Sequence, residues 1–569
     1  MLDIESSITR KFPNLARPGA RLRQPAVSLL RKLIREQDIN HFLKRHQGLR
    51  GLDFIDRIFE HFDFSYRVSE RDRANIPAQG RVVIVANHPI GSLDGLALLR
   101  LISAVRPDVK IVANELLMAF EPLHDLLLPL DNMSRSGYRR SYKAILGALE
   151  AEQAVIIFPA GEVSRARPQG IRDGAWQTGF LHFARKAKTP VLPVLIEAKN
   201  SLLFYGTSAL FKPFSTALLA REMFNKRSSE ISLRVGDPIP AHALDTKNLA
   251  DKALLKRLKK HLYQLGKNRR QSFVTEKTIS HPEDPRSLRT ELESAELLGN
   301  TRDQHRIYLC DYHQHPRVLR EIGRLRELTF RLVGEGTGSR RDLDRYDTYY
   351  RHLVLWDEQN LCIAGAYRLG DTAAILEQQG IDGLYTAELF RLRPSLKPYL
   401  REGLELGRSF VNPAYWGKAS LDYLWQGLGA YLARHPHIRY LIGPVSLSAE
   451  YPKTLQDLLV FYFQRYYYSP PALAGARHPH FIEPEEFQRL SSLFEGLDRD
   501  LGFALVQQLF AEQQRKVPVL FKQYPALYEP GGYQLLAFSV DSAFGHCVDG
   551  LFMGDLQQMK EKKKTRYLA

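Results

Sequence analysis

Cysteine is scarce in this chain. The 569 residues include three cysteines, Cys310, Cys362 and Cys547, an odd number spread far apart. Such a set is not a disulfide framework and is typical of a reducing compartment. The chain also lacks an uninterrupted apolar run of about 20 residues, the length that a membrane-spanning helix requires. Its first residues carry acidic side chains and no apolar core, which does not fit a secretory signal. We therefore expect a cytoplasmic protein whose contact with membranes is peripheral.

Acidic residues are also in short supply. Asp and Glu number 63 against 80 Lys and Arg, which gives a net charge of +17 at pH 7. A basic chain favours polyanionic partners, namely nucleic acid, anionic lipid or acidic carrier proteins. Zinc-finger spacing and an aromatic RNA-binding signature are both absent, so only the charge supports nucleic acid. We expect no nucleic-acid partner, no metal and no bound cofactor. With 44% hydrophobic residues, the chain is long enough for about two to four domains.

Residues 1–75 form the first expected segment. Between residues 25 and 47, apolar side chains recur at helical spacing among arginines and lysines, and a second such pattern includes Ile55, Ile58 and Phe62. Basic amphipathic helices of this kind either lie in an anionic membrane interface or cover a neighbouring domain. The sequence leaves both interpretations open.

The stretch from Arg81 to Leu98, RVVIVANHPIGSLDGLAL, contains the clearest candidate site. An apolar run of strand length precedes a turn, and apolar residues at helical spacing follow it. The turn holds His88 and Asp94. An imidazole can remove a proton from a hydroxyl group, and a nearby carboxylate fixes its tautomer and stabilises the imidazolium that forms. A purely structural pair is the alternative, because short motifs have a high false-positive rate.

From about residue 81 to residue 238, apolar strands alternate with helical patterns, which predicts an α/β layer structure. The expected strands are 82–86, 109–113, 154–158, 190–196 and 231–235, and the expected helices are 96–105, 138–152 and 175–186. The turn FPAGEVSR at 158–165 follows the third strand and has several arginines close by. It is either a ligand-binding loop, suited to phosphate, or a solvated basic loop.

Three blocks of this region resemble those of the glycerolipid acyltransferases related to 1-acylglycerol-3-phosphate acyltransferase. NHPIGSLDG, FPAGEVSR and PVLPV (190–194) occur in the order and approximate separation of that family's main blocks. The resemblance implies transfer of a fatty acyl group from a thioester to a lipid hydroxyl at a membrane surface. It also implies roles for single residues: His88 as the base, Asp94 as its partner, and Arg135, Gly161, Glu162 and Arg165 as acceptor-binding residues.

The sequence departs from this family pattern in two places. Five residues separate His88 from Asp94 where the family has four, so the loop must bulge for the carboxylate to reach the ring. In the third block, Ala160 stands where the family has an acidic residue, and Glu162 lies on the other side of the glycine. Both departures match a branch of the superfamily that is associated with aminolipid synthesis and often labelled haemolysin-like.

A linker and a second domain are expected next. Residues 266–298 are rich in Arg, Lys, Ser, Pro and Glu and have little apolar periodicity, which predicts a linker between a domain at 76–265 and another at 299–569. In the second domain we expect a strand at 306–311, a helix at 318–331, antiparallel strands at 352–356, 362–368, 384–389 and 402–411, and a helix at 418–434.

This order of elements is similar to that of the GNAT-type N-acyltransferases, and more closely to the branch with acyl-homoserine lactone synthases and ornithine N-acyltransferases. The residues that carry the resemblance are Arg326, Phe330, Asp344, Asp347, Arg368 and the run ELGR, from Glu405 to Arg408. It implies that Glu405 is catalytic and that the two aspartates, the three arginines and Phe330 bind substrate. Acylation of an amine requires loss of its proton, which a carboxylate such as Glu405 can take directly or through water. Asp344 and Asp347 are suited to holding a cationic amino acid. The alternative is an ion-paired strand and a solvated acidic turn.

We thus predict an α/β protein with two acyltransferase domains, an α/β glycerolipid acyltransferase-like domain followed by a GNAT-like α+β domain. The whole resembles the fused ornithine-lipid synthases. The resemblance implies that the C-terminal domain joins a 3-hydroxyacyl group to an amino acid such as ornithine, and that the N-terminal domain O-acylates the resulting lyso-lipid. The implied acyl donor is a thioester of acyl carrier protein or coenzyme A.

The expected partners are acyl carrier protein and the anionic inner face of the cytoplasmic membrane, in addition to the amino acid and lyso-lipid substrates. Two alternatives stay open. One is a lysophospholipid acyltransferase with a non-catalytic second domain, and the other is a non-enzymatic membrane-binding protein.

Overall fold

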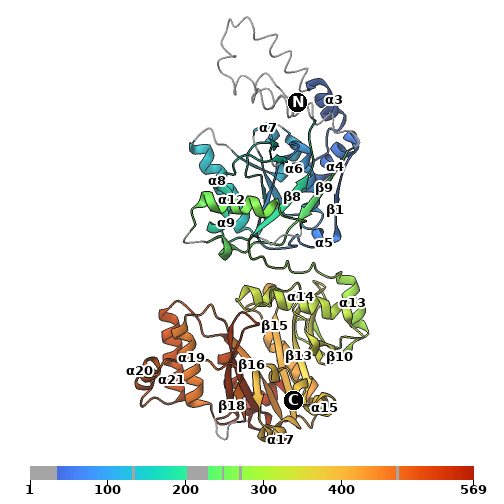
Figure 1. Ribbon diagram of the computed structural model, residues 1–569. Coiled ribbons are helices and arrows are strands. Elements are labelled where there is room, and N and C mark those ends of the chain that lie inside the picture. Colours follow the sequence, from blue (N-terminus) through green and yellow to red (C-terminus); the bar gives the residue numbers. More distant parts are fainter. Residues whose placement is uncertain are drawn as a thin grey trace, which may run out of the picture. The chain divides into compact units, whose positions relative to one another are not determined.

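The computed structural model of the chain forms two compact units (Figure 1), unit 1 at Met1–His281 and unit 2 at Pro282–Ala569. It describes residues 35–113, 115–118, 120–130, 135–168, 170–201, 229–245, 249–267, 272–468 and 473–568. The amphipathic pattern expected before residue 35 lies outside these ranges. Within them, no helix is both long enough and apolar enough to cross a bilayer.

A seven-stranded sheet forms the centre of unit 1, in the order β1-β9-β8-β2-β5-β3-β4. Neighbouring strands are parallel except β8 and β9. The strands are β1 (Phe64–Val68), β2 (Val82–Ala86), β3 (Val109–Ala113), β4 (Leu127–Pro129), β5 (Ala154–Ile157), β8 (Val191–Glu197) and β9 (Ser229–Val235), and β6 (Arg165–Arg167) and β7 (Gly170–Arg172) form a separate hairpin. All five strands that the sequence predicts are present. Unbroken apolar runs such as β2 are buried along their whole length, as central parallel strands are.

Helices cover both faces of this sheet. They are α3 (Glu36–Arg45), α4 (Gly51–Phe62), α5 (Glu70–Arg73), α6 (Ser92–Ser103), α7 (Glu115–Met118), α8 (Arg135–Glu150), α9 (Gly179–Lys186) and α12 (Asp251–Leu262). Helices α4 and α6 pack with Ile84 on one face, and α8, α9 and α12 pack with Val83 and Val85 on the other. The apolar side of α4, including Phe54 and Ile55, is buried in this core. That side therefore covers the sheet and does not face a membrane.

An eight-stranded sheet forms the centre of unit 2, in the order β10-β11-β12-β13-β15-β16-β19-β18. Its strands are β10 (Glu296–Asn300), β11 (His305–Cys310), β12 (Arg351–Asp357), β13 (Cys362–Asp371), β15 (Gly403–Val411), β16 (Tyr440–Leu447), β18 (Tyr533–Asp541) and β19 (Cys547–Asp555), and β14 (Phe390–Leu392) pairs separately with β17 (Ala474–Ala476). Neighbours are antiparallel except β15 and β16. These two strands pair only between residues 403–405 and 440–442, although both continue further.

Two long helices pack on opposite faces of this second sheet. Helix α14 (Pro316–Leu332) shares a core with Val354 and Trp356, and helix α18 (Ser420–Arg434) shares one with Leu353 and Leu355. Alternate residues of β12 therefore face alternate helices. The other helices of the unit are α13 (Pro285–Glu293), α15 (Thr372–Gln379), α16 (Thr386–Leu389), α17 (Lys397–Leu400), α19 (Lys453–Tyr466), α20 (Pro484–Leu493), α21 (Arg499–Glu512), α22 (Val519–Gln523) and α23 (Glu561–Tyr567).

The structure differs from the sequence-based expectation in two segments. Residues 266–298 contain helix α13 and the start of strand β10, so only their first part connects the units. The strand expected at 384–389 is mostly the short helix α16, whose apolar residues are buried in a local core beside Tyr346 and Tyr350.

Candidate active sites

The first candidate site lies where β2 ends and α6 begins. The Asn87 side chain extends β2 toward β8, because its amide donates to the Ile196 carbonyl at 2.9 Å and its oxygen accepts from the Ile196 N–H at 2.7 Å. Gly91 has a φ of 99°, which favours glycine, and α6 starts immediately after it. The loop is thus fixed at the carboxyl edge of the parallel strands, where α/β sheets bind ligands.

His88 and Asp94 face each other in this loop. Nδ1 of His88 lies 2.8 Å from Oδ1 of Asp94, whose side chain is fully buried. The other oxygen, Oδ2, accepts from the N–H groups of Ile90 at 2.8 Å and Gly91 at 3.3 Å. These bonds close the longer loop, so the extra residue does not prevent the carboxylate from reaching the ring. Nε2 is left as the nitrogen that can take a proton from a substrate.

The surroundings raise the pKa of His88. Burial disfavours the imidazolium, but the charge and hydrogen bond of Asp94, together with the charge of Asp173, outweigh burial. The ring of Phe158 packs on the imidazole with 4.3 Å between ring centres. A raised pKa makes the imidazole a stronger base, which suits proton removal from a hydroxyl group.

Asp173 belongs to this site although the sequence interpretation did not include it. Its Oδ1 accepts from the His88 N–H at 3.2 Å and from the Ser164 hydroxyl at 2.5 Å, and its Oδ2 accepts from the Trp176 indole at 2.9 Å. The Ser164 N–H in turn donates to the His88 carbonyl at 2.7 Å. One buried carboxylate therefore ties the His88 loop to the loop after β5. The only signal in the sequence is an acidic residue at the end of a basic segment, RARPQGIRD.

The residues expected to bind the lipid acceptor follow strands β4 and β5. Gly161 has a φ of 63° and turns the chain after β5, and Nη2 of Arg165 lies 3.4 Å from Oε2 of Glu162. Arg135 is the first residue of α8, and its side chain lies outside the description. Because β2, β4 and β5 run in the same direction, the segments that follow them share one edge of the sheet with His88. The role of these residues in acceptor binding stays a prediction.

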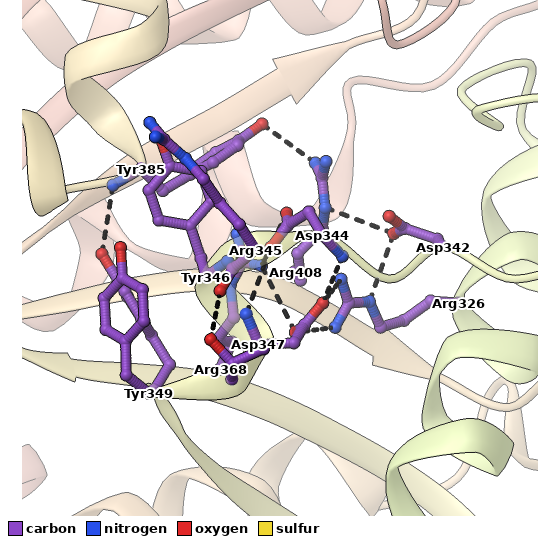
Figure 2. Close-up of polar contacts among 12 residues, drawn as sticks. Arg326, Asp342, Asp344, Arg345, Tyr346, Asp347, Tyr349, Arg368, Tyr385 and Arg408 are labelled. Atoms are coloured by element: carbon purple, nitrogen blue, oxygen red, sulfur yellow. Dashed lines mark hydrogen bonds and ion pairs between the residues drawn. The ribbon is translucent and has the colours of Figure 1, made fainter. Parts of the chain in front are cut away.

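Figure 2 shows the second group of charged residues, in unit 2. Arg326 of α14 donates to Asp347 at 2.8 Å and lies 3.2 Å from Asp342. Arg368 of β13 donates to the two oxygens of Asp344 at 2.7 and 2.8 Å. Burial would raise the pKa of Asp347, but the charges of Arg326 and Arg368 hold it well below its usual range. A buried ion network of this kind loses several kcal/mol when one partner is removed, about 3–5 in other proteins.

The network gives the two predicted aspartates different surroundings. Asp347 is fully buried and is shared between Arg326 and Arg368, which ties α14 and β13 to the turn before β12. The Asp344 side chain is 25% exposed. Of the two, Asp344 is therefore better placed to meet a cationic amino acid, and this role stays a prediction.

Asp342 is a further member that the sequence interpretation did not include, and it joins Arg326 to Arg408. Nε of Arg408 lies 3.2 Å from Asp342, and Nη1 donates to the Tyr385 hydroxyl at 3.0 Å. The guanidinium of Arg408 also lies 4.5 Å from the ring centre of Phe544, which packs edge-on against Phe330. Arg408 has a φ of 48°, where β15 slips in register against β13. Backbone strain of this kind concentrates at functional sites.

Glu405, the predicted base, is buried among hydrogen-bond donors. Its carboxylate accepts from the Tyr350 hydroxyl and from the N–H groups of Tyr385 at 3.2 Å and Thr386 at 2.7 Å. These bonds anchor the start of α16 to β15. A carboxylate offers about four acceptor positions, so these three contacts do not fill it. Its role as the base stays a prediction.

Two other buried carboxyl groups lie near Arg408 and have raised pKa values. Burial, and then repulsion by Asp541, raises the pKa of Asp549 to about 7. Burial, and then repulsion by Asp549, raises the pKa of Glu335 to about 8. A general base works best with a pKa near the working pH, so both groups are alternatives to Glu405. The sequence interpretation did not include them because they lie far apart in the chain and meet only in the fold.

A cavity of about 50 Å³ lies where β15 and β16 stop pairing. The strands contribute residues 406–409 and 441–445, and the other lining residues are aromatic: Tyr367, Trp425, Tyr524, Tyr528, Tyr533 and Phe552. Such walls suit apolar groups. Among the residues that the structure describes, no group of three or more His, Cys, Asp or Glu side chains could hold a metal ion.

Family models match both units. A model described as "acyltransferase" matches residues 6–269, and a model described as "acetyltransferase (GNAT) domain" matches residues 325–426. Together with the two folds, these matches make the protein an acyltransferase.

Three curated relatives are similar to this chain over large parts of their own length. A glycine Nα-acyltransferase of Bacteroides thetaiotaomicron is 28% identical over 303 residues, which cover 51% of this chain and 89% of that protein. A lyso-glycine lipid O-acyltransferase of Phocaeicola vulgatus is 30% identical over 38% of this chain and 80% of that protein. An L-ornithine Nα-acyltransferase of Rhodobacter capsulatus is 30% identical over 40% and 80%, respectively. The chain belongs to the families of the last two of these acyltransferases and combines an acyltransferase unit with a GNAT unit.

Proposed function

We propose that this protein makes an aminolipid in two acyl transfers: unit 2 N-acylates an amino acid, and unit 1 O-acylates the product. The His88–Asp94 pair at the edge of the first sheet supports this proposal most directly, because a hydroxyl acceptor needs such a base. The second unit supports it through buried carboxyl groups near Arg408, which lines a largely aromatic cavity.

In the first transfer, the α-amine of the amino acid attacks the carbonyl carbon of an acyl thioester. A C–N bond forms, the C–S bond breaks, and the thiolate leaves. The proton lost by the amine passes to a carboxylate and then to the thiolate. Glu405 is the predicted acceptor of this proton, with Asp549 and Glu335 as alternatives. Asp344 is a candidate for holding a side-chain ammonium group of the amino acid, and Arg408 for holding its carboxylate.

The second transfer needs a hydroxyl group that these amino acids do not supply. Neither glycine nor ornithine, the amino acids in the relatives' names, carries one. An O-acyltransferase that acts on an N-acylated amino acid of this kind must therefore use a hydroxyl group of the acyl chain. This reasoning supports a 3-hydroxyacyl thioester as the donor of the first transfer.

In the second transfer, Nε2 of His88 takes the proton of that hydroxyl group while its oxygen attacks a second thioester. A C–O bond forms, the C–S bond breaks, and the imidazolium returns its proton to the leaving thiolate. The buried Asp94 stabilises the imidazolium and holds Nε2 toward the substrate.

We further propose acyl carrier protein as the source of the thioesters and an anionic membrane as the place of the second transfer. A net charge of +17 favours both partners by electrostatic steering. Helix α8 begins at the same edge of the sheet as the His88 loop, and its first turns expose Arg139, Arg140 and Lys143. This helix is a candidate contact for an acidic surface.

Two single variants test the order of the transfers in an assay that supplies amino acid and acyl thioesters. His88→Ala should accumulate lyso-lipid, with O-acylation reduced about a hundredfold or more, because the general base is lost. Glu405→Gln should reduce both products. Lipid mass spectrometry measures the two products together, and His182→Ala and Glu402→Gln, at exposed positions, are matched controls.

The outcomes separate the proposal from its rivals. If His88→Ala formed as much diacylated lipid as the unmodified protein, the assignment of O-acylation to unit 1 would be wrong. Normal N-acylation in Glu405→Gln would move the base to Asp549 or Glu335. If the protein acylated lysophosphatidate but formed no N-acyl amino acid, it would be a lysophospholipid acyltransferase with a non-catalytic second unit.

A further inference from the structure

The cavity between β15 and β16 contains a group of hydroxyls within its aromatic wall. The hydroxyl oxygens of Tyr367 and Tyr524 are 2.7 Å apart. Ser409 lies beside both hydroxyls, and Trp425 lies beside that of Tyr367. All four residues line the cavity. Two tyrosine hydroxyls, a serine hydroxyl and an indole thus lie together in a wall that is largely aromatic.

The backbone of β13 and β15 places this group. The two strands slip in register between Ala366 and Arg368, so Tyr367 lies opposite the strained Arg408 and its neighbour Ser409. Tyr367 packs in the core beneath α18, whereas Arg408 packs on Tyr385 and Phe544. The register slip therefore places Arg408, which lies near the buried carboxyl groups, next to Ser409 and opposite Tyr367.

The hydroxyls of Tyr367, Tyr524 and Ser409 have hydrogen-bonding capacity that they do not use among themselves. Each hydroxyl has one proton and two lone pairs, so three hydroxyls can accept six hydrogen bonds but supply only three protons. Even with the Trp425 indole as a fourth donor, acceptor positions remain. A ligand hydroxyl can donate to one of them, whereas a plain hydrocarbon chain gains nothing there and leaves the polar atoms facing it unpaired.

We propose that Tyr367, Tyr524 and Ser409 form the subsite that selects an acyl chain with a hydroxyl close to its thioester. This inference rests on the proposed N-acylation. The thioester carbonyl must lie beside Glu405 and Arg408 for the amine to reach it. A hydroxyl on the third carbon is two bonds further along the chain, and Ser409 and Tyr367 line the cavity next to Arg408. The N-acylated product then carries the hydroxyl group that unit 1 acylates.

The test compares two thioesters of equal chain length, one with and one without the 3-hydroxyl group, as donors for N-acylation by the full chain. For each variant, kcat/KM is measured for both donors and their ratio is taken. Tyr524→Phe and Tyr367→Phe should each lower the preference for the hydroxylated donor by about tenfold, the value of one hydrogen bond in a buried site. Most of the loss should fall on the hydroxylated donor, because the plain chain makes no such bond.

Tyr528→Phe is the matched control, because Tyr528 lines the same cavity but is not one of the three residues of the proposed subsite. Its ratio should equal that of the unmodified protein. Ser409→Ala provides a second measurement if Tyr367→Phe fails to fold, and it should also lower the ratio. A ratio unchanged in Tyr524→Phe and in Ser409→Ala, with N-acylation intact, would overturn the proposal. If the unmodified protein N-acylates the amino acid with neither donor, the proposed function fails first and this inference falls with it.

Discussion

Two carboxylates hold the His88 loop, and each holds a different part of it. Asp94 contacts the imidazole and closes the loop with its second oxygen. Asp173 contacts the main chain of His88 and joins it to Ser164. Asp94 therefore acts on the ring, whereas Asp173 positions the residue that carries it. A second negative charge beside the ring also adds to the raised pKa of His88.

Replacement of Asp173 by Asn should separate these effects. Asn keeps an acceptor for the His88 N–H but removes the charge, so the pKa of His88 should fall. A general base acts when deprotonated, so the acidic limb of the O-acylation rate should move to lower pH. The pH dependence of kcat/KM for O-acylation measures this shift. A lower rate with an unmoved pH profile would make Asp173 a purely structural residue.

The local part of the first site could be predicted from the sequence, and the distant part could not. His88 and Asp94 lie within one strand, turn and helix, so their meeting depends on a few backbone angles. Asp173, Asp342 and Asp549 reach their sites through the packing of whole strands. A lone aspartate in the sequence does not reveal which strand it will meet.

At the scale of elements, the same limit explains which expectations failed. Long apolar runs such as β2 are placed in a parallel sheet in one way, as strands buried on both faces. The expected strand at 384–389 is too short for periodicity to separate strand from helix. Helix α13 did leave a signal within the expected linker: Asp284 accepts from the Ser287 N–H at 2.8 Å as N-cap, Pro285 follows it, and Leu288 and Leu292 form a buried stripe.

Helix α18 carries a testable close contact between elements. A side chain on Gly429 would lie 1.5 Å from the main-chain oxygen of Tyr567, the last residue of α23. Gly429→Ala should therefore push α23 away and lower the free energy of unfolding by about 1–3 kcal/mol, the usual cost of overpacking. Calorimetric melting measures the change.

Gly147 of α8 offers the opposite case for the same substitution. Nothing lies within 4 Å of a side chain there. Gly147→Ala should raise stability by roughly 0.5–1 kcal/mol, because alanine favours a helix. Equal effects of the two substitutions would contradict the packing of α23 on α18.

At the scale of the whole molecule, the residues described for each candidate site all belong to one compact unit. A mixture of His88→Ala and Glu405→Gln proteins should then form diacylated lipid, because one variant supplies lyso-lipid and the other consumes it. Lipid mass spectrometry of the mixture, compared with each variant alone, tests this. An inactive mixture of two variants that each retain their unaltered transfer would instead mean that lyso-lipid passes only between sites of one chain.

The order of the units along the chain runs opposite to the order of the proposed reactions. A ribosome completes unit 1, the proposed consumer of lyso-lipid, before it has made unit 2, the proposed supplier. A chain interrupted during synthesis therefore has at most the consuming activity. Single-chain amphiphiles disturb bilayers, so with the proposed activities an N-terminal fragment of this chain would release no lyso-lipid.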